Sequence, residues 1–427
     1  MSPADRRPTA GGAGGTRSGG GGEPLGAGAE PQGLPPVAVS TPGKLILMGE
    51  HAVVYGRPAL VAAIDLRLRA SFSSPPPAAP ADVDIDLPGL PHRTAASWRE
   101  IFAYARAARD AWTAYEATPR VESFLALRGS DPAHLVKVAL GEVAAALGDG
   151  PESAPPPLCL RLDSDLPLGS GFGSSAAAAV AVVAGFAAWR AGGGGAAATA
   201  ASSASSANIA GIANTAGIAG SLDLAAIERL ALEAERRQHG LPSGVDTATS
   251  LHGGLLWARR RPQGGGLACE PLATSSPLLA RLRVYHTGTP PESTGAVVAA
   301  VRARRDLDPA GQEALFDRME AAALALRRQL EAEFPDAARV VALIRDHQSC
   351  LEALGVVPEP VRALVRQVEA AGGAAKISGA GSLAGPGAGS LLVYHEDADR
   401  AAGWDFLSPF PCYPVHLGAT GCRREIP

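Results

Sequence analysis

The sequence predicts an α+β fold built from two domains. Stretches of strand length, rich in aliphatic and β-branched residues, recur together with stretches of helical periodicity, and the two kinds do not alternate as regular β-α-β units. The chain has 427 residues, of which 46% are hydrophobic, and this size favours two buried cores over one. We therefore expect one domain over residues 37–253 and a second over residues 254–427.

The chain opens with a segment that we do not expect to fold. Residues 1–36 are mainly Gly, Ala, Pro and Arg, with almost no large apolar side chain. Such a segment buries too little apolar surface to offset the entropy lost on ordering. We therefore expect a disordered tail.

The elements of the first half follow in order. Glycine and proline turns separate the first predicted strands, at residues 37–39, 45–48 and 59–70. Helical periodicity then appears at residues 97–117 and 132–148. A strand at residues 158–162 leads into a glycine loop and a long alanine-rich helix.

A low-complexity segment separates this helix from the rest of the chain. Residues 191–222 consist largely of Gly, Ala and Ser, and we interpret them as an insertion between two helices. In the second half, helices are predicted between residues 294 and 371, and strands at residues 255–257, 282–285 and 391–394.

Composition and charge exclude several classes of function. A net charge of −4 gives no reason to expect nucleic acid or an anionic membrane as a partner. The five cysteines include no C-x-x-C pair, which argues against a disulfide framework and a zinc site. The most apolar stretch, residues 176–189, is shorter than the roughly 18 residues of a membrane span, and no apolar segment follows Arg6-Arg7 to make a signal peptide. We expect a cytoplasmic protein.

A lysine and a Glu-His pair lie at the two ends of a predicted strand. Lys44 opens the apolar stretch 45–48, and Gly49-Glu50-His51 follows its end. Alternation would place Lys44 on the same face as Ile46 and Met48, where a lysine is unusual unless that face meets a polar pocket. There its ammonium could neutralise a phosphate or a developing alkoxide. The alternative is an edge-strand lysine followed by a structural turn.

A glycine loop runs directly into the alanine-rich helix. This loop, residues 165–175, has glycine at 169, 171 and 173 and ends on two serines. It is neither a Walker A motif nor the dinucleotide-binding G-x-G-x-x-G motif. Glycines nevertheless let backbone N–H groups approach an anion, the helix N-terminus favours negative charge, and the serine hydroxyls could contact phosphate or magnesium. The alternative is a capped helix of small residues, because the chain has 51 glycines, some in runs without evident function.

Two carboxylates flank a turn further along the chain. Glu235 lies near the end of a helix predicted from residue 222 to about residue 237, and Asp246 follows Pro242-Ser243-Gly244. Each carboxylate, considered alone, could be structural. Together with a phosphate loop and a lysine they supply what phosphoryl transfer needs, since one can hold magnesium and the other can accept a hydroxyl proton.

These three segments resemble the signatures of a known family. Residues 42–56 resemble the first signature of the mevalonate kinases, which belong to the GHMP kinase superfamily, and residues 166–176 resemble the second, with Phe172 in place of the usual leucine. Residues 235–246 resemble the segment that joins a magnesium-binding glutamate to the catalytic aspartate. Weaker matches follow, in family order, at residues 291–294, 354–356 and 376–381. The resemblance spans residues 37–395 and implies an α+β fold of two domains with the active site in the cleft between them.

The resemblance also implies an activity and site residues. The activity is ATP-dependent phosphorylation of the primary hydroxyl of mevalonate, with Mg²⁺ as cofactor and often a homodimer as the assembly. Asp246 would contact the substrate and take its proton, and Lys44 would lie beside Asp246, contact ATP and stabilise the attacking oxygen. Glu50 and His51 would line the mevalonate pocket. Ser175 and Glu235 would hold Mg²⁺. The ATP phosphates would be bound by Gly169, Ser170, Gly171, Phe172, Gly173, Ser174 and Ser175, with Ser164 as a further contact before the loop.

One segment departs from the family pattern. After Gly379-Ala380-Gly381 the family continues with more glycines and a strand, whereas here the loop 379–389 is longer. Substrate choice therefore stays open, and the alternative activity is that of another GHMP kinase, for phosphomevalonate, homoserine or a sugar. The Gly-Glu-His-Ala-Val-Val block favours mevalonate, because galactokinase-like enzymes usually continue Gly-Glu-His with Thr-Asp and phosphomevalonate kinases generally lack the block. A non-catalytic member is a second alternative, which is disfavoured by the presence of Lys44, Ser175, Glu235 and Asp246.

Overall fold

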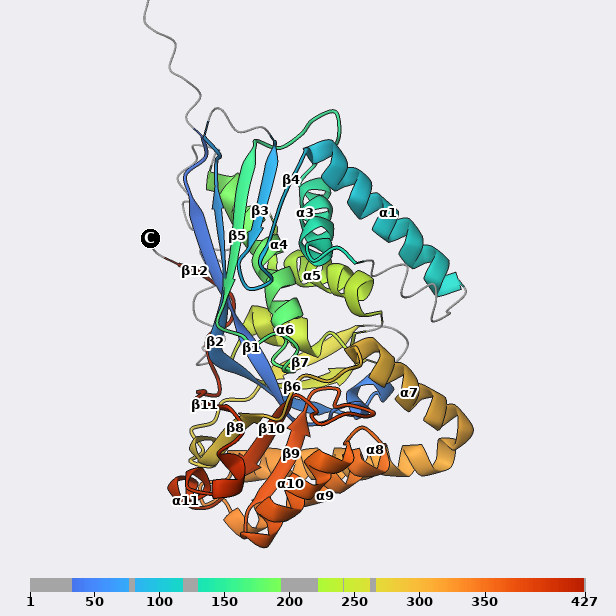
Figure 1. The fold of residues 1–427 in the computed structure, drawn as a ribbon, viewed down its shortest axis with the longest axis vertical. Helices are drawn as coiled ribbons and strands as arrows, with labels where there is room; N and C mark the ends of the chain where they lie inside the picture. Colours follow the sequence, from blue (N-terminus) through green and yellow to red (C-terminus); the bar gives the residue numbers. More distant parts are fainter. Residues whose placement is uncertain are drawn as a thin grey trace, which may run out of the picture. The chain divides into compact units, whose positions relative to one another are not determined.

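The computed structural model describes residues 33–76, 81–117, 130–192, 222–240, 242–261 and 266–425 (Figure 1). Within these ranges the strands form two sheets. From Gly33 onward the chain forms one compact unit. The predicted tail over residues 1–36 and the predicted insertion over residues 191–222 lie almost wholly outside the described residues.

The first sheet has the strand order β12-β1-β2-β5-β3-β4, and β6 pairs with β2 and with β7. Its strands are β1 (Val37–Met48), β2 (Ala59–Ser73), β3 (Val83–Leu87), β4 (His92–Ala96), β5 (Leu158–Ser164), β6 (Leu255–Arg260), β7 (Leu267–Pro271) and β12 (Arg423–Glu425). β3 and β5 run parallel, while β1 and β2 form a long antiparallel pair. The register of this pair shifts between Pro42 and Gly43, where proline has no N–H for the ladder, directly before Lys44.

Helices cover one face of this sheet, with α4 at their centre (Figure 1). They are α1 (Trp98–Ala117), α3 (His134–Ala146), α4 (Ser174–Gly192), α5 (Leu224–His239) and α6 (Val245–His252). α4 packs against β1, β2 and three of the other helices. Its small residues allow a close approach, since a Cβ on Gly185 would lie 2.2 Å from Cε2 of Phe72.

α4 contains the apolar stretch 176–189, but the helix is longer than that stretch. It has 19 residues and is long and apolar enough to cross a membrane by length and composition. However, 78% of its most apolar window is buried inside the protein, which is also what a core helix shows.

The second sheet is antiparallel, with the strand order β11-β8-β10-β9. Its strands are β8 (Leu282–His286), β9 (Ala374–Ser378), β10 (Ser390–Tyr394) and β11 (Cys412–Tyr413). The helices of this part are α7 (Thr294–Leu307), α8 (Pro309–Glu331), α9 (Ala337–Ala353), α10 (Glu359–Ala370) and α11 (Ala398–Ala402), and α9 and α10 pack on β9. The side chains of Ser293, Asp308 and Asp336 cap the N-termini of α7, α8 and α9.

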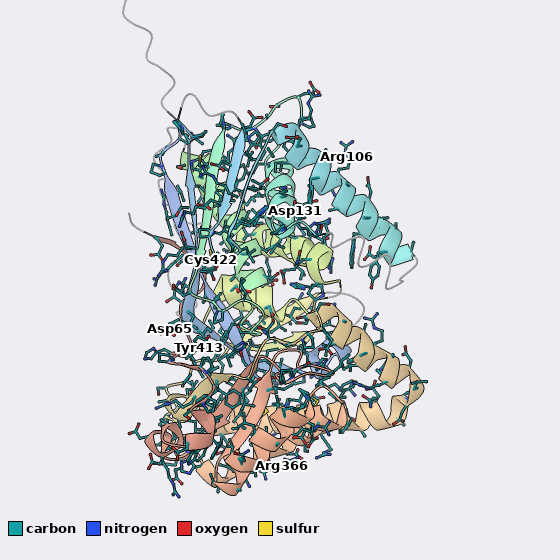
Figure 2. All side chains as sticks on the ribbon, in the orientation of Figure 1. Asp65, Arg106, Asp131, Arg366, Tyr413 and Cys422 are labelled. Atoms are coloured by element: carbon teal, nitrogen blue, oxygen red, sulfur yellow. The ribbon has the colours of Figure 1, made fainter. Side chains whose placement is uncertain are left out.

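The arrangement of helices and sheets agrees with the predicted α+β class. The domain boundary at residues 253/254 stays a prediction. β6 and β7 lie after this boundary in the sequence, but they pair within the first sheet. One hydrophobic cluster also joins residues of both sheets, such as Leu45 on β1 and Leu392 on β10. All five cysteines are free, and Cys422, labelled in Figure 2, is buried.

Candidate active site

Lys44 on β1 and Asp246 on α6 form an ion pair, with 3.2 Å between Nζ and Oδ2. The side chain of Lys44 is 4% exposed and that of Asp246 is 36% exposed, so the carboxylate is the member of the pair that faces solvent. α6 begins directly after Gly244, whose φ of 86° glycine adopts without steric cost. Two residues predicted to act together, but far apart in the sequence, are thus neighbours.

The glycine loop lies beside Lys44. The N–H of Lys44 donates to the carbonyl oxygen of Phe172 over 2.8 Å, and a Cβ on Gly173 would lie 2.9 Å from Cγ of Lys44. Gly169, Gly171 and Gly173 have positive φ angles of 69°, 83° and 75°. Alternating conformations of this kind can turn backbone N–H groups toward an anion, and α4 begins directly afterwards. The loop and helix start therefore suit a phosphate next to an ammonium group.

Two side chains of this loop point into the protein. The buried hydroxyl of Ser170 donates to the carbonyl oxygen of Pro167 over 2.6 Å, and the carbonyl oxygen of Ser170 accepts from the hydroxyl of Ser390. Phe172 is buried, and its ring packs edge-on against Tyr413 with 5.4 Å between centroids. Ser170 and Phe172 can therefore offer a nucleotide their backbone but not their side chains.

The other serines predicted to contact ATP differ in their surroundings. Ser174 is the first residue of α4 and is half-buried. Ser164 is exposed at the end of β5, where its hydroxyl accepts a hydrogen bond from the N–H of Leu166 over 3.1 Å. Contacts of Ser164 and Ser174 with a nucleotide stay predictions.

Ser175, in the first turn of α4, lies between two side chains of α5. Its hydroxyl bonds to Oε1 of Glu235, and Nε2 of His239 lies 2.9 Å from Oγ. Burial raises the pKa of Glu235 to about 8, the bond from Ser175 opposes this shift, and the negative charge of Asp246 adds to it. A bound cation would stabilise the ionised form of such a buried carboxyl group, which lies near a second carboxylate.

His239 is a site residue that the sequence prediction does not include. Glu235 and His239 are four residues apart on α5, so their side chains share one face of the helix. The sequence pattern places the helix end near residue 237, whereas α5 continues to His239. A helix predicted two residues longer, together with this spacing, would have identified His239.

Glu50 and His51 form the turn between β1 and the short 3₁₀ helix η1 (Ala52–Tyr55). Glu50 is 1% exposed, and its Oε1 is bound by Nζ of Lys376 on β9. The Nε2–H of His51 donates to the carbonyl oxygen of Ala380 over 2.9 Å, and burial lowers the pKa of His51 to about 4. Both side chains are therefore engaged by the second sheet and the loop after it, and their direct contact with a substrate stays a prediction.

The atypical loop 379–389 packs beside the glycine loop. A Cβ on Gly379 would lie 3.7 Å from Cα of Gly171. The hydroxyl of Ser382 donates to Oε2 of Glu292 over 2.7 Å, which ties the loop to the segment before α7. Despite its length, the loop 379–389 therefore contacts both the glycine loop and the segment before α7.

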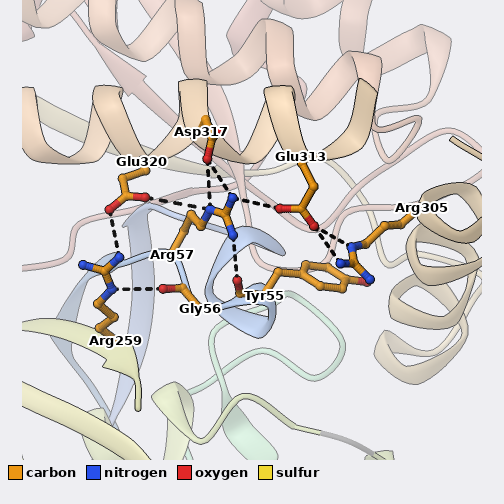
Figure 3. Close-up of polar contacts among 8 residues, drawn as sticks. All are labelled: Tyr55, Gly56, Arg57, Arg259, Arg305, Glu313, Asp317 and Glu320. Carbon is orange, nitrogen blue, oxygen red and sulfur yellow. Dashed lines mark hydrogen bonds and ion pairs between the residues drawn. The ribbon is translucent and has the colours of Figure 1, made fainter. Parts of the chain in front are cut away.

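The segment after η1 is held by an ion-pair cluster (Figure 3). The guanidinium of Arg57 pairs with three carboxylates of α8: Glu313, Asp317 and Glu320. The ring of Tyr55 stacks on Phe316 with 4.6 Å between centroids, and Arg305 lies over the same ring. These contacts fix the far end of η1 to the helices of the second half.

Sequence comparison relates this chain to one enzyme family. The family of GHMP kinases N terminal domains matches residues 134–195, which include the glycine loop. The chain is similar to the mevalonate kinase of Mus musculus, with 31% identity over 406 residues that cover 90% of this chain and 93% of that protein. It is 30% identical to the mevalonate kinase of Homo sapiens over 399 residues, covering 90% and 93% of the two chains. The mevalonate kinase of Archaeoglobus fulgidus is 27% identical over 343 residues, covering 80% and 88%.

Solved structures share the fold at lower identity. A crystal structure of mevalonate kinase aligns with a TM-score of 0.62 and 16% identity, covering 90% of this chain and 99% of that one. L. major mevalonate kinase in complex with R-mevalonate gives 0.58 and 20%, covering 90% and 96%. Streptococcus pneumoniae phosphomevalonate kinase in complex with phosphomevalonate and AMPPNP gives 0.59 and 14%, covering 89% and 99%. These likenesses confirm the predicted fold class.

Proposed function

We propose that this chain, which belongs to the mevalonate kinase family, transfers the γ-phosphoryl group of ATP to the primary hydroxyl of mevalonate. The observation that carries this proposal is the ion pair of Lys44 and Asp246 beside the glycine loop. The ion pair supplies a carboxylate base and a buried cation, and the adjacent start of α4 supplies a site suited to an anion. Phosphoryl transfer needs these three parts.

Lys44 and Asp246 would carry the chemical step. The hydroxyl oxygen forms a bond to Pγ while the bond from Pγ to the β–γ bridging oxygen breaks, so that 5-phosphomevalonate and ADP are formed. Asp246 accepts the hydroxyl proton, and its partly exposed carboxylate can meet an alcohol that enters from solvent. The ammonium of Lys44 stabilises the negative charge that develops on the attacking oxygen.

The glycine loop and the start of α4 would hold the ATP phosphates. The glycines at 169, 171 and 173 have positive φ angles that can turn backbone N–H groups toward a phosphate, and the helix N-terminus adds a favourable field. Ser170 and Phe172 would contribute only their backbone, because their side chains are buried in the protein. The positive charge of Lys44 adds to the attraction for the phosphates.

Ser175 and Glu235 would hold Mg²⁺. Within the described part of the chain, no group of three or more His, Cys, Asp or Glu side chains could hold a metal ion. Magnesium, however, is commonly bound by one or two protein oxygens together with substrate phosphates and water. The raised pKa of Glu235 fits this role, because a divalent cation would stabilise its ionised form. When bound, Mg²⁺ neutralises charge on the phosphates.

The proposal is tested by an ADP-release assay on the purified protein with Mg²⁺-ATP. Mevalonate, phosphomevalonate, homoserine and galactose are supplied in parallel as acceptors. We expect strong turnover with mevalonate alone. Turnover with a different acceptor would keep the phosphoryl-transfer chemistry and assign substrate choice to the loop 379–389. A protein that binds ATP but turns over none of the four acceptors would refute the proposed activity.

A further inference from the structure

The carboxylate of Glu50 is engaged inside the protein. Glu50 is 1% exposed, and its Oε1 is bound by the ammonium of Lys376, which is also 1% exposed. Its Oε2 is buried without a hydrogen-bond partner and lies 3.6 Å from Nε2 of His347 on α9. An incoming alcohol cannot reach this carboxylate without a rearrangement of the turn. Any effect of Glu50 on the substrate must therefore be transmitted through the turn to which it belongs.

Lys376 uses all of its donors within the protein. Besides Glu50, its Nζ donates to the carbonyl oxygens of Ile46, over 3.1 Å, and Ile377, over 2.7 Å. An ammonium has three N–H donors, so none is left for a substrate or a phosphate. Lys376 is therefore suited to hold other groups in place rather than to bind a ligand.

Further hydrogen bonds join the same two regions of the chain. The hydroxyl of Ser378 on β9 accepts from the N–H of Ile46 on β1 over 2.9 Å. The N–H of Gly49 donates to Nε2 of His347 over 2.9 Å, and burial lowers the pKa of His347 well below its usual value. The end of β1 and the turn after it are thus connected by polar contacts to β9 and α9.

A buried ion pair of this kind is not explained by stability alone. Burial raises the pKa of Glu50 and lowers that of Lys376, while their mutual attraction opposes both shifts. The cost of removing two charges from water often exceeds their attraction, so an apolar pair of similar volume is commonly as stable. The pair therefore suggests a role that an apolar contact could not fill, such as fixing one geometry.

The choice of lysine supports the same conclusion. Lys and Arg together number 38, and the lysines among them are Lys44, Lys137 and Lys376. In a chain that uses arginine for nearly every cation, two of these lysines are buried, and one of them, Lys376, is bonded to the proposed substrate turn. An ammonium donates three hydrogen bonds from one compact nitrogen, whereas a guanidinium is larger and directs its donors within one plane.

We propose that Lys376 is a positioning residue, which holds Glu50 and thereby fixes the turn 49–52 beside Lys44 for recognition of the acceptor alcohol. The turn needs such support because its backbone is unusual. His51 is a non-glycine residue with a φ of 57°, in the left-handed region. Gly49 has a φ of 100°, and a Cβ there would lie 2.5 Å from the carbonyl oxygen of Pro58. Lys376 secures the beginning of this turn, as Arg57 secures the segment after η1 (Figure 3).

The test substitutes Lys376→Met, which keeps the length of the side chain and removes its charge. This inference rests on the proposed function, so two readouts are used. With mevalonate and ATP, we expect the KM for mevalonate to rise at least about tenfold and the KM for ATP to change less than about twofold. Amide hydrogen exchange, which needs no substrate, should become faster in residues 47–56 but not in residues 169–175.

Two further variants separate positioning from a general loss of stability. Lys137→Met is the matched control, because Lys137 forms an ion pair with Asp131 over 2.7 Å in another part of the chain. Asp131 is labelled in Figure 2. This variant should change neither the KM for mevalonate nor the exchange of residues 47–56. The double variant Glu50→Gln/Lys376→Met removes both buried charges. If the pair fixes the turn, this double variant regains stability but keeps the raised KM and the faster exchange.

The outcomes can be told apart. A double variant with wild-type KM and wild-type exchange would overturn the inference, because an unpaired charge would then explain the single variant. Unchanged exchange in Lys376→Met would overturn it as well. If the wild-type protein does not phosphorylate mevalonate, the proposed function fails, and the exchange measurement alone decides the role of Lys376.

Discussion

The ammonium of Lys44 lies 3.2 Å from the carboxylate of Asp246, and the two side chains differ in exposure. Lys44 is enclosed by β1 and the glycine loop, whereas more than a third of the Asp246 side chain remains open. This asymmetry suits a cation that stays fixed and a base that meets an incoming alcohol. It also predicts how substitutions at the two positions should act.

Asp246→Ala and Lys44→Ala should each lower kcat far more than they weaken ATP binding. Positioned acid–base groups contribute roughly 10²- to 10⁴-fold to the rate, so we expect losses of that order in kcat. Turnover is followed by ADP release, and nucleotide affinity by titration calorimetry with a non-hydrolysable ATP analogue. The control is Asp65→Ala, at an exposed carboxylate that pairs with His416. Near-normal turnover in either site variant would remove that residue from the mechanism.

Glu235→Gln should raise the Mg²⁺ concentration that the enzyme requires. The substitution keeps the size of the side chain and the partner of Ser175 but removes the charge that would hold the metal. We expect the Mg²⁺ dependence at fixed ATP to shift by at least about tenfold. Glu228→Gln is the matched control, because Glu228 is on the same helix and pairs with His252. An unchanged metal titration in Glu235→Gln would count against its role as a ligand.

The parts of the site that were predictable are those encoded by short stretches of sequence. The helix predicted after Gly173 is α4, and the strands predicted at residues 37–39 and 45–48 are the two ends of one continuous strand, β1, in which Pro42-Gly43 shifts the register but makes no turn. Such elements follow from local periodicity and turn residues, which a single sequence displays. Lys44, Glu235 and Asp246 were predicted from their conjunction with the glycine loop, and the structure places these three residues together around Ser175 and the loop.

Contacts between distant segments could not be predicted in the same way. The bond between Lys376 and Glu50 depends on how β9 lies beside the end of β1, and no local pattern specifies that arrangement. The same is true of β12, a three-residue strand near the C-terminus that pairs with β1 through Ala38 and Glu425. Strands this short are too brief to show a period of two. Pairing partners of this kind are decided by tertiary packing.

Gly173→Ala should weaken ATP binding because the glycine loop would have to move. The φ of Gly173 is 75°, which costs a residue with a Cβ roughly 1–2 kcal/mol, and that Cβ would also press on Lys44. We expect the KM for ATP to rise about tenfold. In the control Gly148→Ala, φ is 88° but no atom lies within 4 Å of the added Cβ. Gly148→Ala should therefore lose only the backbone part of this stability, roughly 1–2 kcal/mol in urea unfolding, and keep the KM for ATP. Equal effects on KM in both variants would contradict the prediction.

His51 should make the folded protein sensitive to acid. Burial lowers its pKa from 6.5 to about 4, so the native state keeps His51 neutral at pH values where the unfolded chain binds a proton. The free energy of unfolding is therefore unaffected by this group above pH 6.5. It decreases as the pH falls from 6.5 toward 4, by up to about 1.4 kcal/mol per pH unit. In His51→Asn this slope disappears, and asparagine tolerates the left-handed backbone of the turn.

Urea unfolding at pH values between 7 and 4 measures this effect as a difference between proteins. His51→Asn is expected to be less stable than the wild type at pH 7, because the bond to Ala380 is lost, yet to lose less stability on acidification. His416→Asn, at an exposed histidine, should keep a slope close to that of the wild type. Parallel curves for the wild type and His51→Asn would mean that His51 titrates normally in the folded protein. His51 would then not be buried in solution as it is in the structure, and the proposed role of the turn 49–52 would lose its support.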